Sequence, residues 1–206
     1  MNDPADSVHE IATLRIELLD SEPLIWRQLE VPTSITLKAL HDTVQAAMGW
    51  FDAHLWEFTI GETRYGPPAA DDGWGAIKPI NATKVRLRDV LKPGKTAIGY
   101  VYDFGDTWEH RLTITNTRTG DPTIAYPRFI AGEEACPPED CGGMPGFYDF
   151  LDAIADPSHP NHADTLDWCG GRYDPKDIDE EQIKISLNRI AKRRRAAQTR
   201  RKQKTI

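Results

Sequence analysis

The stretch YVYDFGDTWEH, residues 100–110, decides the fold that we expect. The segment AIG precedes it and the alternating segment RLTIT follows it, which is typical of two paired strands. Gly105 and Asp106 suit a hairpin turn between them, because glycine tolerates positive φ and aspartate accepts local backbone hydrogen bonds. The predicted register pairs Asp103 with Trp108, Tyr102 with Glu109, and Val101 with His110.

This register predicts two faces for the hairpin. One face would carry Ala97, Val101, Asp103, Trp108, His110, Leu112 and Ile114. The other would carry Tyr100, Tyr102, Glu109 and Arg111. Asp103 and His110 would then be diagonal neighbours beside Trp108, so the turn gathers polar groups at the end of an apolar sheet face.

Hydrophobic spacing predicts the remaining elements. Strands are expected at 13–20, 25–31 and 55–60, and helices between Thr36 and Gly49 and at 84–91, 147–156, 161–169 and 179–195. The Pro- and Gly-rich segments 66–79 and 126–146 predict loops, with no long helix or strand in the second. The sequence predicts a single compact α+β domain, in which helices pack on an antiparallel sheet of hairpins.

The composition is that of an ordinary globular protein, with 39% hydrophobic and 28% charged residues in a chain of 206. No apolar run reaches the roughly 20 residues that cross a bilayer, and the first residues lack the pattern of an export signal. We therefore expect a soluble, cytoplasmic protein without a membrane partner. The three cysteines are expected to be reduced, because an odd number in a chain of this size does not suggest a disulfide framework.

The formal charge of −7 is unevenly distributed. Residues 189–206 hold nine Lys or Arg and no acid, whereas residues 1–188 hold 16 bases and 32 acids. We therefore divide the chain into a domain at 8–188 and a basic, partly disordered helical tail at 189–206. The tail could be an arm for polyanions, could lie on its own acidic body, or could be a solvated helix end. As an arm it would bind nucleic acid weakly, without sequence preference and only at low salt. The candidate contacts are Arg193, Arg194, Arg195, Arg200, Arg201 and Lys202.

A divalent metal is one cofactor that the sequence allows, although no cofactor is identified. Histidine and cysteine side chains favour zinc, and those that could supply ligand pairs are His110, Cys136, Cys141, His159, His162 and Cys169. The candidate metal ligands that we select are Asp103, His110, Cys136 and Cys141. Alternatively, Asp103, Asp106, Glu139 and Asp140 could supply oxygen ligands to magnesium or manganese. The structural alternative is that these carboxylates cap turns and bind loop amides.

Several uncommon sequence motifs occur along the chain: PLIWRQLEVP (23–32), MGWFDAHLWEF (48–58), YDFGDTWEH (102–110), CPPEDCGG (136–143) and a late YDP before a helix. In these motifs and their order, the chain resembles the plasmid pRiA4b ORF-three-like family over about residues 10–190. The resemblance implies a compact α+β domain of the kind found in bacterial chromosomes, plasmids and transposon-borne genes. It implies no particular reaction, and the basic tail lies outside it.

Two functions from different classes follow. The first is a non-enzymatic binding or regulatory domain associated with plasmids or mobile elements, with an unidentified protein or small-molecule ligand. Its aromatic and acidic cleft, walled by Trp50 or Trp108, would be lined by His54, Asp103, Asp106, Trp108, His110, Glu139 and Asp140. The second is a metal-dependent hydrolase that uses His110 and neighbouring carboxylates. For His54, a hydrogen-bonded place in the core is the alternative to a ligand role.

Overall fold

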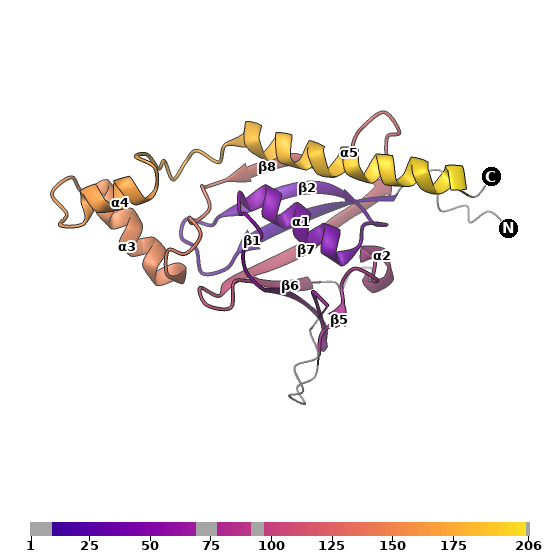
Figure 1. Ribbon diagram of the computed structural model, residues 1–206, viewed down its shortest axis with the longest axis horizontal. Coiled ribbons are helices and arrows are strands. Elements are labelled where there is room, and N and C mark those ends of the chain that lie inside the picture. Colours follow the sequence, from indigo (N-terminus) through magenta and orange to yellow (C-terminus); the bar gives the residue numbers. More distant parts are fainter. Residues whose placement is uncertain (1–9, 69–77, 92–96, 205–206) are drawn as a thin grey trace.

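The computed structural model describes residues 10–68, 78–91 and 97–204. Its strands are β1 (Glu10–Leu18), β2 (Trp26–Pro32), β3 (Trp56–Ile60), β4 (Thr63–Gly66), β5 (Ile80–Asn81), β6 (Ala97–Tyr102), β7 (Trp108–Thr119) and β8 (Arg128–Glu133). Its helices are α1 (Leu37–Met48), α2 (Leu87–Val90), α3 (Gly143–Ala155), α4 (His162–Trp168) and α5 (Glu180–Lys204). In these residues the strands form one sheet in the order β5-β4-β3-β6-β7-β1-β2-β8 (Figure 1). The pairing is antiparallel except between β4 and β5.

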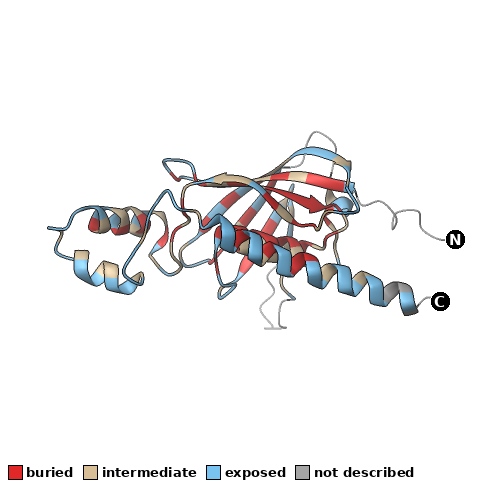
Figure 2. Ribbon diagram, turned by 90° about the horizontal axis from the view of Figure 1, so that it is seen from above, coloured by how far each residue is buried: buried red, intermediate tan, exposed pale blue. Residues whose placement is uncertain are grey.

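One face of the sheet forms the core. Along β1 the residues Leu14, Ile16 and Leu18 are fully buried, and Arg15 and Glu17 between them are only partly buried. This is the alternation expected of a sheet with one covered face. Helix α5 runs along the sheet and packs against α1 and β8 (Figure 2). The predicted α+β class, with helices on an antiparallel sheet, is confirmed.

Helix α1 begins and ends where its sequence predicts. The Thr36 hydroxyl accepts a hydrogen bond from the Ala39 amide at 3.2 Å, which caps the first turn. Gly49 closes the last turn in the left-handed conformation, with φ of 83°. Its apolar stripe, which includes Leu37, Leu40 and Val44, is fully buried against the sheet.

The hairpin forms, but the predicted register is wrong by one residue on β6. Tyr102 pairs with Trp108, Val101 with Glu109, and Tyr100 with His110. The turn holds five residues, because the Thr107 amide donates to the Asp103 carbonyl at 2.6 Å. Asp103 and Thr107 take positive φ in this turn, whereas Gly105 does not. Tyr100 and Tyr102 therefore share the buried face with Trp108 and His110, and Asp103 lies in the turn beyond the end of the strand.

The segment 126–146 holds more regular structure than its composition predicts. Strand β8 pairs with β2, and its prolines do not interfere because Pro127, Pro137 and Pro138 lie outside the strand. Helix α3 begins within the same segment, at Gly143. The other predicted loop, 66–79, is flanked by β4 and β5, and its residues 69–77 lie outside the described ranges.

Helix α5 continues without interruption past residue 189. Ile183, Leu187 and Ile190 are buried, so its first half docks on the body. Beyond them, Arg194 Nη2 donates to Ser34 Oγ at 2.5 Å and Arg195 Nη2 donates to the Ile124 carbonyl at 2.6 Å. The side chains of Arg201 and Lys202 lie outside the described residues. Among the helices described, none combines the length and apolarity that a membrane span needs.

Candidate functional site

Three loops meet at one end of the sheet, and we call the surface they form the loop face: residues 50–55, 103–107 and 137–142. The Asp103 amide donates to the Leu55 carbonyl at 2.9 Å, which joins the first two loops. The Trp50 indole donates to the Pro137 carbonyl at 2.9 Å, and the Gly142 amide donates to Asp106 Oδ2 at 3.2 Å. Each loop is therefore hydrogen-bonded to the other two.

Gly143, directly after the loop face, permits one of these approaches. A Cβ atom at this position would lie 2.6 Å from the Asp106 carbonyl oxygen, and the backbone has a φ of 69°. Only glycine meets both conditions without strain. The glycines of the CPPEDCGG segment thus bring this loop against the hairpin turn.

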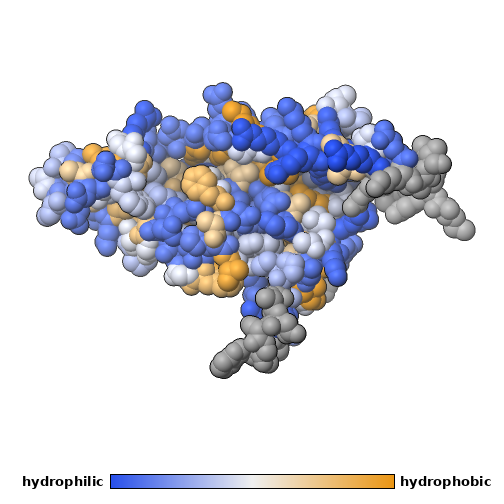
Figure 3. All heavy atoms as spheres, in the orientation of Figure 1, coloured by the Kyte–Doolittle hydropathy of each residue, from blue (hydrophilic) through white to orange (hydrophobic). Residues whose placement is uncertain are grey.

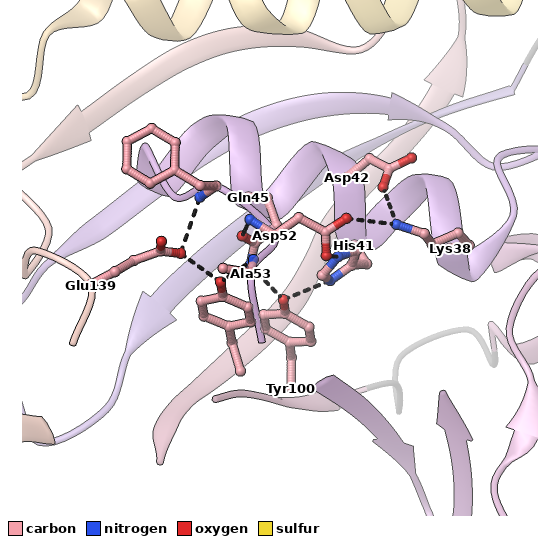
Figure 4. Close-up of polar contacts among 10 residues, drawn as sticks. Lys38, His41, Asp42, Gln45, Asp52, Ala53, Tyr100 and Glu139 are labelled. Carbon is pink, nitrogen blue, oxygen red and sulfur yellow. Dashed lines mark hydrogen bonds and ion pairs between the residues drawn. The ribbon is translucent and has the colours of Figure 1, made fainter. Parts of the chain in front are cut away.

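Tyr102 and Glu139 tie the loop face to the sheet. The Tyr102 hydroxyl donates to Glu139 Oε1 at 2.5 Å and accepts a hydrogen bond from the Ala53 amide at 3.0 Å (Figure 4). Glu139 Oε1 also accepts from the Phe51 amide at 3.0 Å. Burial and the Glu139 carboxylate raise the pKa of Tyr102 well above its usual value. The hydroxyl thus stays protonated and holds loops 50–55 and 137–142 together.

A second, partly buried network anchors loop 50–55 to α1 and β6. His41 lies between the Tyr100 hydroxyl, 2.8 Å from Nδ1, and Asp52 Oδ1, 2.6 Å from Nε2 (Figure 4). Lys38 Nζ lies 3.0 Å from the other Asp52 oxygen, and Gln45 donates to the Tyr100 hydroxyl at 3.0 Å. Burial lowers the pKa of His41 to about 4, although Asp52 opposes that shift. Tyr100, His41 and Gln45 are buried, whereas the side chains of Lys38 and Asp52 reach the surface, so this network ties loop 50–55 to the core.

His54, Asp103 and Asp140 form the polar centre of the loop face, and we call them the His54 cluster. His54 Nδ1 lies 3.6 Å from Asp103 Oδ2, and Nε2 lies 3.2 Å from Asp140 Oδ1. One ligand atom from each residue can be chosen so that all three lie within 4.8 Å of one another. Three of the predicted cleft residues are thus brought together, each from a different loop.

His110 and Trp108 lie beneath the loop face, on the sheet. His110 is buried, with Nδ1 3.0 Å from the Trp108 carbonyl and 3.3 Å from the Tyr100 carbonyl. Burial lowers its pKa to about 4. The Trp50 ring contacts both side chains, at centroid distances of 5.3 Å from His110 and 6.0 Å from Trp108. Trp50 thereby connects this layer to the loop at Pro137.

The two cysteines predicted as metal ligands, Cys136 and Cys141, do not belong to the His54 cluster. Cys136 Sγ accepts from Arg27 Nη2 at 3.3 Å and lies 3.7 Å from Met48 Sδ, and burial raises the pKa of this thiol. Burial, then the Asp106 charge, raises the pKa of Cys141 to about 12. Among the described residues, two groups of three side chains lie close enough to share a metal ion, and neither group contains Cys136, Cys141 or His110.

Large apolar side chains on the loops of the loop face remain exposed. Phe51 is 83% exposed, Leu55 62% and Phe104 52%, and all three belong to the loops of the loop face. Figure 3 shows apolar residues reaching the surface in the middle of the molecule, among hydrophilic ones. Exposed apolar residues gathered in this way mark interaction sites more often than single ones do.

An acidic groove adjoins the loop face. It has a volume of about 720 Å³, starts at Asp140 and Cys141 and continues between α3 and α4. Its charged and aromatic lining comprises Asp149, Asp152, Asp164, His159, Phe150 and Trp168. Asp140 and Cys141, at the start of this groove, are among the predicted site residues. Its continuation was not predictable, because nothing in the sequence of the two helices shows that they face each other.

The backbone of the loop face is also unusual. Asp52, Asp103, Thr107 and Asp140 all take left-handed conformations, with φ between 57° and 59°. Aspartate accepts this conformation more readily than most residues, whereas threonine is β-branched and does so rarely.

Comparisons with known proteins agree with this architecture. The uncharacterized protein y4hQ of Sinorhizobium fredii is 38% identical over 186 residues, which cover 89% of this chain and 94% of that protein. The crystal structure of the protein of unknown function MM3350 from Methanosarcina mazei Go1 superposes with a TM-score of 0.78 at 29% identity, covering 85% of this chain and 97% of that one. The model of the plasmid pRiA4b ORF-3-like proteins matches residues 10–182. With most of its length matched by that model, the chain belongs to the plasmid pRiA4b ORF-3-like family.

Proposed function

We propose that this protein is a non-enzymatic binding domain, with a regulatory role in plasmids or mobile elements, that recognises a basic and partly apolar segment of a partner protein. The observation that carries the proposal is the exposure of Phe51, Leu55 and Phe104 around the carboxylates of the loop face. Apolar anchors next to charged groups are typical of protein interfaces. The setting in plasmids or mobile elements is part of the proposal and rests on the name of the family.

The charge of the adjoining groove defines the kind of partner. Asp140, Asp149, Asp152 and Asp164 line it together with the exposed ring of Trp168. Carboxylates attract Lys and Arg side chains, and an indole face binds their cationic groups. A segment with an apolar residue on the loop face and Lys or Arg in the groove would satisfy both surfaces.

The buried networks support binding at this place. Tyr102 and His41 hold loop 50–55 from the sheet side, so its exposed residues are presented on a fixed backbone. A site that is ordered before binding loses less conformational entropy when the partner arrives. The networks therefore favour recognition by a preformed surface.

The alternative function, a metal-dependent hydrolase, draws its support from the carboxylates of the loop face. The histidine proposed for it gives less support, because His110 is buried and its Nδ1 faces two backbone carbonyls. A catalytic acid or base needs contact with the substrate or with one intervening water. We therefore place binding first.

A displayed library of random peptides tests the proposal. We expect selection on the wild-type protein to enrich peptides that combine an aromatic or aliphatic residue with Lys or Arg. The double variant Phe51→Ser/Phe104→Ser should lose these peptides, and Asp152→Asn should weaken them. Ile80→Ser on β5 is the matched control, since Ile80 is also exposed but lies outside the loop face and the groove. Peptides without basic residues, or binding that the double variant retains, would contradict the proposal.

A further inference from the structure

We propose that His54, Asp103 and Asp140 bind a divalent transition-metal ion such as Zn²⁺ or Mn²⁺. The inference deepens the proposed function, because the ion would lie at the polar centre of the loop face. Only its consequence for partner binding rests on that proposal.

The distances in the His54 cluster suit a shared ion. Two ligand atoms at about 2.1 Å from one metal, at tetrahedral or octahedral angles, lie roughly 3.0–3.4 Å apart. His54 Nε2 and Asp140 Oδ1 are separated by 3.2 Å. Asp103 Oδ2, 3.6 Å from Nδ1, can complete the set or can orient the imidazole, as carboxylates behind metal-bound histidines do.

An unsatisfied polar atom provides a second observation. The Nε2 atom of His54 is buried and, within the described part of the chain, makes no hydrogen bond of normal geometry. Asp103 is only 8% exposed; its Oδ1 accepts from the Gly105 amide at 2.9 Å, whereas Oδ2 faces His54 at 3.6 Å, beyond hydrogen-bonding distance. A buried imidazole nitrogen is unfavourable without a partner. A cation bound to Nε2 would satisfy it, and the nearby Asp103 carboxylate would balance part of the charge of the ion.

The donor set indicates the class of ion. One imidazole nitrogen and two carboxylates suit zinc, manganese or ferrous iron, whereas calcium and magnesium favour oxygen donors alone. The side chain of Asp140 is 71% exposed, so the site is open to solvent. A bound ion would therefore keep coordination positions for water or for a donor from the partner.

A second group of ligand atoms in the described residues, His41, Asp42 and Asp52, does not support the same inference. Lys38 Nζ lies 2.7 Å from Asp42 and 3.0 Å from Asp52, so an ammonium group already neutralises these carboxylates. Both nitrogens of His41 have partners within hydrogen-bonding distance. An ion there would have to displace all of these interactions.

Titration calorimetry with ZnCl₂ or MnCl₂ on chelator-treated full-length protein tests the inference. We expect one ion per chain, and binding about 10- to 100-fold weaker in His54→Gln and in Asp140→Asn. Glu62→Gln removes an exposed carboxylate between β3 and β4, outside the loop face and the groove, and should leave the affinity unchanged. Asp140 is exposed, so its variant should fold, and thermal melts of each variant verify this.

Cysteine ligation is the main competing outcome. Cys141→Ser should retain the metal, and the Co²⁺-loaded protein should lack the intense near-ultraviolet band of thiolate ligation. The inference is wrong if wild type binds no ion at millimolar metal, if Asp140→Asn and His54→Gln bind like wild type, or if Cys141→Ser alone abolishes binding. Because the probe is the metal alone, loss of peptide binding in Phe51→Ser/Phe104→Ser with intact metal binding would overturn only the proposed function.

Discussion

Acidification should destabilise this protein well above the pH at which its carboxylates titrate, because two histidines are buried in neutral form. Burial lowers the pKa values of His41 and His110 to about 4. In the unfolded chain the pKa of histidine is near 6.5, so between these values the unfolded chain binds more protons than the folded one. The stabilisation is fully present above about pH 6.5 and is lost as the pH falls toward about 4.

The size of the effect follows from these values. Between pH 7 and 5.5 each histidine should lower the free energy of unfolding by about 1.2 kcal/mol, and the two together by about 2.5 kcal/mol. Ion-paired carboxylates add little in this range, because the pKa values of Glu30 and Asp52 are themselves lowered, despite burial, by Arg128 and Lys38 respectively. Urea unfolding followed by tryptophan fluorescence, repeated at half-unit steps of pH, measures the dependence.

Variants assign the effect to the two imidazoles. His41→Gln and His110→Gln should each halve the pH dependence, whatever they do to the stability at pH 7. Ile98→Val, a core change on β6 that keeps both histidines, should lower the stability by about 1 kcal/mol and leave the pH dependence intact. A free energy of unfolding that is flat from pH 7 to 5.5 in wild type would show that the histidines are not held neutral in the folded protein.

Two further predictions concern the loop face and the C-terminal helix. Tyr102→Phe removes a donor to Glu139 and an acceptor for Ala53, so it should lower the free energy of unfolding by about 2 kcal/mol. Tyr65→Phe, the same change at a partly buried position, should cost far less, and equal losses in urea melts would contradict the role given to Tyr102. Removing residues 196–206 takes away Arg200, Arg201 and Lys202, and we expect it to reduce a weak, non-specific DNA affinity seen only at low salt. A gel shift that is unchanged by truncation, or insensitive to salt, would place nucleic-acid binding elsewhere.

The fold was largely predictable because its signals are local. Alternation marked β1 and β2, and Thr36 and Gly49 marked the ends of α1. The register of the hairpin was not predictable from the same signals, since it depends on left-handed conformations at Asp103 and Thr107 that glycine was expected to supply. Strand β8 was not predicted because its segment is rich in proline. The prolines lie outside Arg128–Glu133, at the edge of the sheet, so they interrupt none of its hydrogen bonds.

Several residues of the candidate site were predictable from the sequence, but the contacts between them were not. Short sequence motifs indicated His54, Asp103, Glu139 and Asp140, and the structure places them on one face. His110 was expected among them, but a register shift of one residue on the opposing strand changes which side chains it meets. The network of His41, Asp52 and Tyr100 has no local signature, because its residues are far apart in sequence and His41 occupies a position in an otherwise apolar helical stripe.

The left-handed residues of the loop face also affect the folding stability of the protein. A non-glycine residue in this conformation is disfavoured by roughly 1 kcal/mol or more, and four of them lie within these loops. The side chains of Asp52 and Asp103 accept hydrogen bonds that offset this cost, whereas the Thr107 hydroxyl donates to the Phe104 carbonyl at 3.3 Å from a β-branched side chain. We therefore expect Thr107→Gly to raise the free energy of unfolding, at the expense of the side chain that this turn presents on the loop face.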